Sequence, residues 1–288
     1  MVKKKKLWIF IGLAALLLLA ALTLWILWAN TALVTTAYTV TSENLPAAFH
    51  GFRIAQVSDL HNAEMGEGNE NLLALLRQAQ PDIIVITGDL IDSRNTDVQI
   101  ALDFAREALK IAPCYYVVGN HEARAHEARR RVLWHLDNMG VTVLENARVE
   151  LEREGEHLVL LGVNDPARHE EEGLGTDAQI LTHYLSPLHT GEDPYTILLS
   201  HRPELFEVYV SHGIDLTLTG HAHGGQFRIP FLGGVAAPNQ GLFPQYDAGL
   251  FREGETAMIV SRGIGNSAFP FRVNNRPEIV VIELKKAE

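Results

Sequence analysis

The chain has 288 residues, of which 47% are hydrophobic and 20% are charged, so it can bury the core of one large domain and lacks the composition of a disordered protein. Its formal net charge is -11, and leaving out the four lysines of the first 28 residues gives -15 for residues 29–288. An acidic body of this kind is a poor general binder of nucleic acid, so no nucleic-acid partner is expected. The one cysteine, Cys114, excludes an intrachain disulfide and a cysteine-rich zinc site, so His, Asp, Glu or Asn would have to hold any metal.

The N-terminus combines a lysine cluster with a long uncharged segment. Lys3 to Lys6 precede Leu7 to Trp28, which contains no charged residue. A helix needs about 20 such residues to span a bilayer, whereas the apolar region of a cleavable signal has about 7–15. We therefore predict a cytoplasmic lysine cluster and a transmembrane signal anchor in residues 1–28, with an unusually long cleaved signal as the alternative. Because lysines favour the cytoplasmic side, the rest of the chain should be extracytoplasmic, held at the cell membrane by a single pass.

Residues 29–48 are expected to form a tether and the first strand, and residues 49–288 one folded domain. Apolar strands alternate with helices in the first half, and strands predominate later. Strands are predicted at 36–42, 52–57, 83–87, 115–118, 141–144, 149–152, 158–163, 197–199, 214–218, 257–261 and 279–284. Helices are predicted at 71–80, from a capping box at Thr96–Gln99 to about 110, at 123–138 and after Pro203. This order predicts an α/β (α+β) fold of two packed sheets covered by helices.

Five of the predicted strands run into a polar cluster. The clusters are Ser58-Asp59-Leu60-His61, Gly88-Asp89-Leu90-Ile91-Asp92, Gly119-Asn120-His121-Glu122, Ser200-His201-Arg202-Pro203 and Gly220-His221-Ala222-His223. Any one of them could be a turn or a helix cap. Five together indicate one site, because the carboxyl ends of strands are where open α/β sheets form their sites. Carboxylate, amide and imidazole ligands favour Zn, Mn or Fe over calcium.

The ordered motifs resemble the calcineurin-like metallophosphoesterase family from about residue 36 to the C-terminus. The tail, Ser261 to Asn266 and Arg276 to Ile279, is similar to the membrane-associated bacterial branch, some of whose members cleave the pyrophosphate of nucleotide-linked lipid precursors. The resemblance implies a four-layer αββα sandwich of two mixed β-sheets flanked by helices. It also identifies residues 49–288 as the phosphoesterase domain and implies two divalent ions.

The resemblance further assigns roles to the clustered residues. Asp59, His61 and His223 would hold the first metal, Asn120, His201 and His221 the second, and Asp89 would bridge them. His121 would not bind metal but would assist the leaving oxygen, with Glu122 or Asp92 as its orienting partner. Asn164 and Asp165 lie where relatives often have two acidic residues, and their role stays open. Arg262 and Arg272 are candidates for substrate binding, with ordinary loop arginines as the alternative.

The implied activity is hydrolysis of a phosphodiester, pyrophosphate or phosphomonoester by a hydroxide shared between two metals, with a lipid-linked ester among the candidate substrates. The alternatives are a nucleotide phosphodiesterase or nuclease, and a catalytically silent metal-bound surface scaffold. Phe227 to Phe251, which follows the last cluster, is rich in Phe and Pro and contains only two charged residues. It is either a loop packed on its own side chains or an aromatic surface that contacts an acyl chain or the bilayer.

Overall fold

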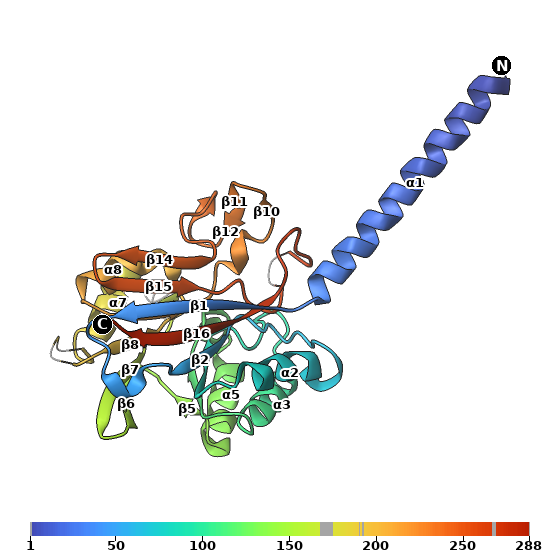
Figure 1. Cartoon of the computed structure of the whole chain (residues 1–288). Helices are drawn as coiled ribbons and strands as arrows, with labels where there is room; N and C mark the ends of the chain where they lie inside the picture. The colour runs from blue at the N-terminus through green and yellow to red at the C-terminus, as the bar shows by residue number, and fades with distance from the viewer. Residues whose placement is uncertain (1, 168–174, 190, 192, 267–268, 288) are drawn as a thin grey trace.

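The computed structural model describes residues 2–167, 175–189, 191, 193–266 and 269–287. A long N-terminal helix, α1 (Val2–Thr31), projects away from a domain that contains two six-stranded sheets (Figure 1). The stretch Lys4–Thr31 is long and apolar enough to cross a membrane, and none of its most apolar window is buried by the rest of the protein. By length and composition alone, α1 therefore fits the predicted anchor.

The first sheet has the strand order β1-β16-β2-β3-β4-β5. Its strands are β1 (Val34–Ser42), β2 (Arg53–Val57), β3 (Ile83–Thr87), β4 (Cys114–Val117), β5 (Thr142–Val143) and β16 (Glu278–Lys286). Strands β2 to β5 run parallel, β16 runs antiparallel to β2, and β1 pairs with β16 along its whole length. The helices α2 (Glu70–Ala79), α3 (Gln99–Ala108) and α5 (His126–Met139) cover the outer face of this sheet.

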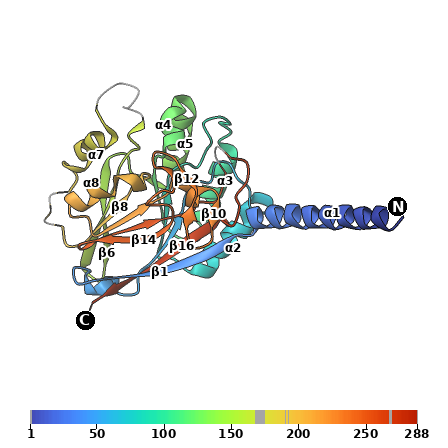
Figure 2. The same cartoon turned by 90° about the horizontal axis from the view of Figure 1, so that it is seen from above.

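The second sheet has the order β14-β15-β9-β8-β7-β6. Its strands are β6 (Ala147–Arg153), β7 (Glu156–Gly162), β8 (Thr196–Leu199), β9 (Leu216–Thr219), β14 (Gly249–Glu253) and β15 (Thr256–Val260). The central strands β7, β8, β9 and β15 are parallel, and the two edge strands are antiparallel. The helices α7 (Asp177–Leu185) and α8 (Phe206–Ser211) cover its outer face, on the opposite side of the sheets from α2 and α3 (Figure 2).

Strand β3 illustrates how the layers pack, because it is buried on both faces. Ile84 and Ile86 belong to the core between the first sheet and its helices. Ile83 and Val85 alternate with them and belong to the core between the two sheets. Successive side chains of a strand point to opposite faces, so the apolar run Ile83 to Ile86 can fill the core on both sides of a central strand. The predicted four-layer αββα sandwich of two mixed sheets is confirmed.

Three local predictions differ from the structure. The capping box at Thr96 is wrong: α3 begins at Gln99, and the Asp97 carboxylate accepts a hydrogen bond from the Gln99 backbone N–H at 3.0 Å. The helix expected at 123–138 is two helices, α4 (Asn120–Arg124) and α5, separated at Ala125. Helix α7, capped by Thr176 and Gln179, was not predicted, nor was the edge strand β14.

Candidate metal centre

The ligand-bearing loops follow β2, β3, β4, β8 and β9, and backbone contacts bring them together. His61 N–H donates to the Asp89 carbonyl at 3.0 Å, which joins the loops after β2 and β3. The two sheets are joined beneath the site by Gln56, whose side-chain amide donates to the Thr219 carbonyl on β9 at 2.8 Å. The carboxyl ends of strands from both sheets therefore line a single site, as their order in the sequence predicts.

The first ligand set contains Asp59, His61 and His223, all of them buried. His61 Nε2 lies 3.1 Å from His223 Nε2, and His223 Nε2 lies 3.3 Å from Asp59 Oδ1. One donor atom from each residue falls within 4.8 Å of the others. Two imidazole nitrogens and a carboxylate oxygen this close together suit a divalent transition metal.

The second set contains Asp89, His201 and His221, which are also buried. His201 Nδ1 lies 2.7 Å from the Thr87 carbonyl oxygen, so Nδ1 carries the ring proton and Nε2 is left to bind a metal. Asp89 Oδ2 lies 3.1 Å from His201 Nε2 and 3.5 Å from His61 Nε2. Asp89 therefore contacts both ligand sets.

Asn120 tests whether a cation fits the second set. One end of its side-chain amide lies 2.8 Å from His221 Nδ1, 3.2 Å from His201 Nε2 and 3.3 Å from Asp89 Oδ2. An amide nitrogen there would donate hydrogen bonds to these atoms, whereas an amide oxygen would join them in facing a cation. With the nitrogen at this inner end, the oxygen would lie at the outer end and accept from Arg124 Nη1 at 2.9 Å. The donor chemistry of the set fits a bound divalent ion when the oxygen faces inward.

The backbone of the site is held in an uncommon conformation. Five of the seven predicted ligands have positive φ angles: Asp59 (53°), His61 (46°), Asp89 (53°), His221 (66°) and His223 (49°). Such conformations of non-glycine residues cost about 1–3 kcal/mol each and cluster at functional sites. Gly119 and Gly220 make room for the ligands, because a Cβ on Gly119 would overlap the Asp89 carboxylate and one on Gly220 would overlap Asp59. Side chains at these two glycines would therefore displace the site.

Charges within the site shift several pKa values. Burial disfavours the charged form of His201, but the carboxylates of Asp89, Asp59 and Asp165 together outweigh burial and raise the pKa of His201 to about 10. Burial lowers the pKa of His223 to about 3. Burial alone would raise the pKa of Asp59, but His223 and His61 hold it below its ordinary value. The metal-free site therefore holds a proton on His201 at neutral pH that an incoming metal must displace.

Metal binding should release protons and weaken as the pH falls from 8 to 5. The sign follows from His201, because its raised pKa keeps the metal-free ring protonated over this range and the proton competes with the metal. Calorimetric titration of the metal-free full chain with Mn²⁺, in buffers of different ionisation enthalpy, counts the released protons. A metal affinity that does not change with pH, with no proton release, would contradict ligation by His201.

His121 lies beside the first set, where His61, Asp92 and His121 form a further group of possible ligands. The Ser93 backbone N–H donates to His121 Nδ1 at 2.9 Å, and Asp92 Oδ1 lies 3.6 Å from the same nitrogen. On the neutral ring the proton is therefore on Nε2. Burial lowers the pKa of His121. Of the two orienting partners considered from the sequence, Asp92 is the one beside the ring.

Glu122, the other orienting partner considered for His121, instead binds backbone N–H groups. Its fully buried carboxylate accepts hydrogen bonds from the backbone N–H groups of Asp89 (2.9 Å), Ile91 (3.0 Å) and Gly119 (3.0 Å). Burial, with a contribution from Asp89, raises its pKa to about 7. Glu122 therefore ties the loop after β3 to the start of α4, which carries Asn120 and His121.

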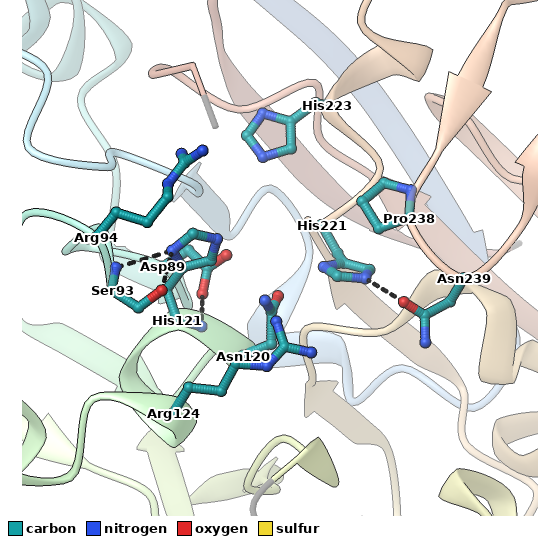
Figure 3. Close-up of a pocket in the computed structure, with 10 residues that line it drawn as sticks. All are labelled: Asp89, Ser93, Arg94, Asn120, His121, Arg124, His221, His223, Pro238 and Asn239. Atoms are coloured by element: carbon teal, nitrogen blue, oxygen red, sulfur yellow. Dashed lines mark hydrogen bonds between the residues drawn. The ribbon is translucent and has the colours of Figure 1, made fainter. Parts of the chain in front are cut away.

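His223 of the first set and Asp89 and His221 of the second line a cavity of about 290 Å³ (Figure 3). It is lined by Asp89, Ser93, Arg94, Asn120, His121, Arg124, His221, His223, Pro238 and Asn239. Arg94 and Arg124 were not identified from the sequence. Arg94 donates to the Asp92 carboxylate at 2.6 Å and 2.9 Å, and the same carboxylate lies 3.6 Å from His121 Nδ1. The one feature of the sequence that could have indicated Arg94 and Arg124 is their position, because each follows the end of a polar cluster by two residues.

Arg262 and Arg272, the arginines proposed from the sequence, do not line this cavity. Arg262 pairs with Glu278, and its backbone N–H donates to the same carboxylate at 2.9 Å. Arg272 is 1% exposed, donates to the Arg262 carbonyl at 2.6 Å and lies with Nη2 3.2 Å from His223 Nδ1. Both lie behind the ligands, where they contact the C-terminal segment.

Asp165, whose role the sequence left open, supports His201. Both of its carboxylate oxygens accept hydrogen bonds from Arg202, at 2.6 Å and 2.8 Å, and both side chains are buried. A buried bidentate pair holds the backbone beside it in one conformation. Asp165 therefore positions the loop that carries His201.

Comparisons with known proteins agree with this geometry. The family model for the calcineurin-like phosphoesterase matches residues 52–225. The metallophosphoesterase YkuE of Bacillus subtilis is 29% identical over 257 residues, covering 87% of this chain and 85% of its own. Phosphodiesterase YaeI of Escherichia coli is 27% identical over 238 residues, covering 81% of this chain and 82% of its own.

Two further comparisons concern a longer relative and the fold. A zebrafish transmembrane protein with a metallophosphoesterase domain is 29% identical, and the chain covers 56% of its length. The crystal structure of TT1561 from Thermus thermophilus superposes with a TM-score of 0.51 at 16% identity, covering 74% of this chain and 90% of that one. That likeness concerns the fold alone. From the family match and the motifs together, the chain belongs to the calcineurin-like phosphoesterase family and is a metal-dependent phosphoesterase.

Proposed function

We propose that the protein is a membrane-anchored, dinuclear phosphoesterase that hydrolyses a phosphodiester or pyrophosphate on the extracytoplasmic side, with a lipid-linked ester as its substrate. The observation that supports two metals is the pair of buried ligand sets that meet at Asp89. Asp59, His61 and His223 would hold one ion, and Asn120, His201 and His221 the other. Mn, Zn and Fe all suit these ligands.

When bound, the ions would polarise the phosphate and lower the pKa of water enough to supply a nucleophile near neutral pH. The protein's own residues would then position the ester and serve its leaving oxygen. His121 lines the cavity with the proton of its neutral ring on Nε2, from which it can donate to that oxygen. Arg94 and Arg124 line the same cavity and suit the remaining phosphate oxygens.

A second cavity supports the lipid-linked part of the proposal. It has a volume of about 330 Å³ and is lined by Ala222, His223, Gln226, Ala236, Ala237, Pro238 and Phe269. His223 and Pro238 also line the metal cavity, so the two cavities adjoin. The lining is apolar apart from His223 and Gln226, which suits a hydrocarbon chain attached to a phosphate.

Hydrolysis by intact spheroplasts tests the activity and the orientation together. Spheroplasts that express the full chain should hydrolyse added bis-p-nitrophenyl phosphate without lysis, because this charged diester does not cross the membrane. A chelator should remove the activity and Mn²⁺ should restore it, and cells expressing Asp89→Ala supply the background. Activity that appears only after lysis would refute the orientation, and none in either preparation would refute the phosphodiesterase assignment.

The lipid-linked substrate has its own test. The purified full chain should show a lower KM for a lipid-linked pyrophosphate than for the same headgroup without its acyl chains, because the apolar cavity adds binding energy. The two esters have the same reacting phosphates, so the comparison isolates the chain. Equal KM values would contradict the lipid assignment and leave the phosphoesterase activity intact.

A further inference from the structure

Exposed apolar side chains are concentrated in two short segments of the domain. Outside α1, and among the residues that the structure describes, eight large hydrophobic side chains are exposed, and seven of them lie between 229 and 243 or at 269 and 271. We call these seven the apolar rim: Ile229, Phe231, Leu232, Leu242, Phe243, Phe269 and Phe271. Phe231 is fully exposed and Phe243 is 61% exposed. A contiguous group of this kind marks an interaction surface.

Hairpins present the first part of the rim. Strands β10 (Arg228–Ile229) and β11 (Gly233–Gly234) form one hairpin, and β12 (Ala236–Ala237) and β13 (Gly241–Leu242) form the next. Phe231 and Phe243 have positive φ angles of 70° and 52°. Bulky residues seldom adopt this conformation. At Phe231 and Phe243 the rings face solvent rather than the domain core. The interpretation of this segment as a loop packed on its own side chains is therefore wrong for Phe231 and Phe243.

The two segments of the rim form one unit. The Phe227 ring packs on Phe269 and Phe271, with centroids 5.3 Å and 5.7 Å apart. The Gln226 side-chain amide donates to the Phe271 carbonyl at 2.7 Å, and Arg228 N–H donates to the Val273 carbonyl at 3.0 Å. The hairpins and residues 269–273 are therefore held together.

This unit is also held to the base of α1. Asn30 and Arg272 exchange two hydrogen bonds, since Arg272 N–H donates to Asn30 Oδ1 at 2.7 Å and Asn30 Nδ2 donates to the Arg272 carbonyl at 2.9 Å. The guanidinium of Arg276 lies over the Trp28 ring, 4.9 Å from its centroid. Arg276 also donates to the Ala32 and Leu33 carbonyls, at 2.7 Å and 3.0 Å. The position of the rim is therefore fixed relative to the helix.

The rim and α1 extend from the same side of the domain. In Figure 1 the hairpins labelled β10 and β11 and the helix α1 both project upward, whereas β6 lies at the lower end. Trp28 is at the end of α1 nearest the domain, which is where interfacial tryptophans lie in a membrane-spanning helix. A bilayer spanned by α1 would therefore have its surface beside the rim.

We propose that the apolar rim inserts into the interfacial layer of the same bilayer that α1 spans, as a second membrane contact of the domain. This inference rests on the proposed membrane anchor. Residues 229–246 contain no charged side chain, while residues 29–288 as a whole carry -15, so this segment brings no negative charge to an anionic lipid surface. Exposed Phe, Leu and Ile side chains are those that enter the headgroup and acyl boundary.

The contact has a consequence for the site. Phe269 belongs to the rim and also lines the apolar cavity that adjoins His223. Insertion of the rim would therefore place the opening of that cavity at the bilayer surface. A phosphoester could then reach the metal ligands while its hydrocarbon chain stayed among lipids.

Fluorescent labels on single engineered cysteines test the inference in the full chain, with one protein molecule in each lipid nanodisc. Burial raises the pKa of the native Cys114 thiol to about 12, so the label reacts with the engineered cysteine. Labels at Phe231→Cys and Phe243→Cys should emit at shorter wavelength and be quenched by lipids with a nitroxide near the headgroup. Retained hydrolysis of a soluble diester shows that each variant is folded.

Three control positions make the result decisive. Trp134→Cys replaces an aromatic residue on α5 whose exposed fraction, 62%, is close to that of Phe243. Glu154→Cys lies in the turn between β6 and β7. Neither of these labels should be quenched. Leu24→Cys on α1 should be quenched by nitroxides deeper in the bilayer.

If Leu24→Cys is quenched and both rim labels are not, the inference is overturned and the anchor stands. If Leu24→Cys is not quenched, the proposed anchor itself fails. Rim labels that shift only in concentrated detergent solution, and not in nanodiscs, would show that a second copy covers the rim.

Discussion

Replacing Asp89 with alanine should remove metal from both ligand sets and lower phosphoester hydrolysis by more than about 10³-fold, since single groups that stabilise transition-state charge are each worth about 10²–10³-fold. Asp89 Oδ2 lies within 3.5 Å of an imidazole nitrogen from each set. Its other oxygen accepts the His121 backbone N–H at 2.8 Å, so the substitution should also loosen His121, the residue we propose to serve the leaving oxygen. Metal content and kcat/KM of the purified full chain measure both effects.

Asp103→Ala is the matched control for Asp89→Ala. Asp103 is an exposed carboxylate on α3 that pairs with Arg106, and surface pairs of this kind contribute at most about 1 kcal/mol to stability. The control should keep its metals and its activity. If Asp89→Ala keeps two ions and more than a tenth of the wild-type activity, Asp89 does not join the two sets.

Replacing His121 with glutamine should lower kcat by about 10²–10⁴-fold, the range expected when a general acid is lost, while both ions stay bound. The reason is its position: Ser93 N–H occupies Nδ1, so Nε2 carries the proton beside the cavity. The loss should be smaller for a p-nitrophenyl ester than for an alkyl ester, because p-nitrophenolate leaves without protonation.

The exposed histidine His126, at the start of α5, provides the control for His121, and His126→Gln should not change kcat. Metal analysis of the His121 variant separates a chemical defect from a loss of ions. Equal losses of kcat for the two leaving groups, or a loss of metal, would contradict the role of His121 as proton donor.

The gathering of the predicted ligands in one site was predictable from their places in the sequence, whereas their division into two metal sets came from the family resemblance. Asp59, Asp89 and His201 each follow an apolar strand by two residues, and parallel strands bring such positions to one edge of a sheet. Two packed sheets covered by helices were predictable from the alternation of apolar strands and helices, and the resemblance to the family added the four-layer αββα arrangement. The site thus follows from local pattern and topology together.

The contacts between distant segments were not predictable from local pattern. Glu122 was considered as an orienting partner of His121, yet its carboxylate accepts hydrogen bonds from three backbone N–H groups of two loops. Arg262 and Arg272 were candidates for substrate binding, whereas Glu278 and the neighbourhood of His223 hold them behind the predicted ligands. Arg94 and Arg124 line the cavity without any motif that separates them from other surface arginines. Such assignments need the three-dimensional arrangement, because each depends on a partner far away in the sequence.

The metal content of the active full chain tests the central claim most directly. Elemental analysis of detergent-purified wild-type protein, combined with its activity against bis-p-nitrophenyl phosphate, gives the number of ions per active chain. The two sets that meet at Asp89 predict two divalent ions per chain, with activity lost when either is removed. Full activity with one ion per chain, or with none, would contradict the dinuclear centre.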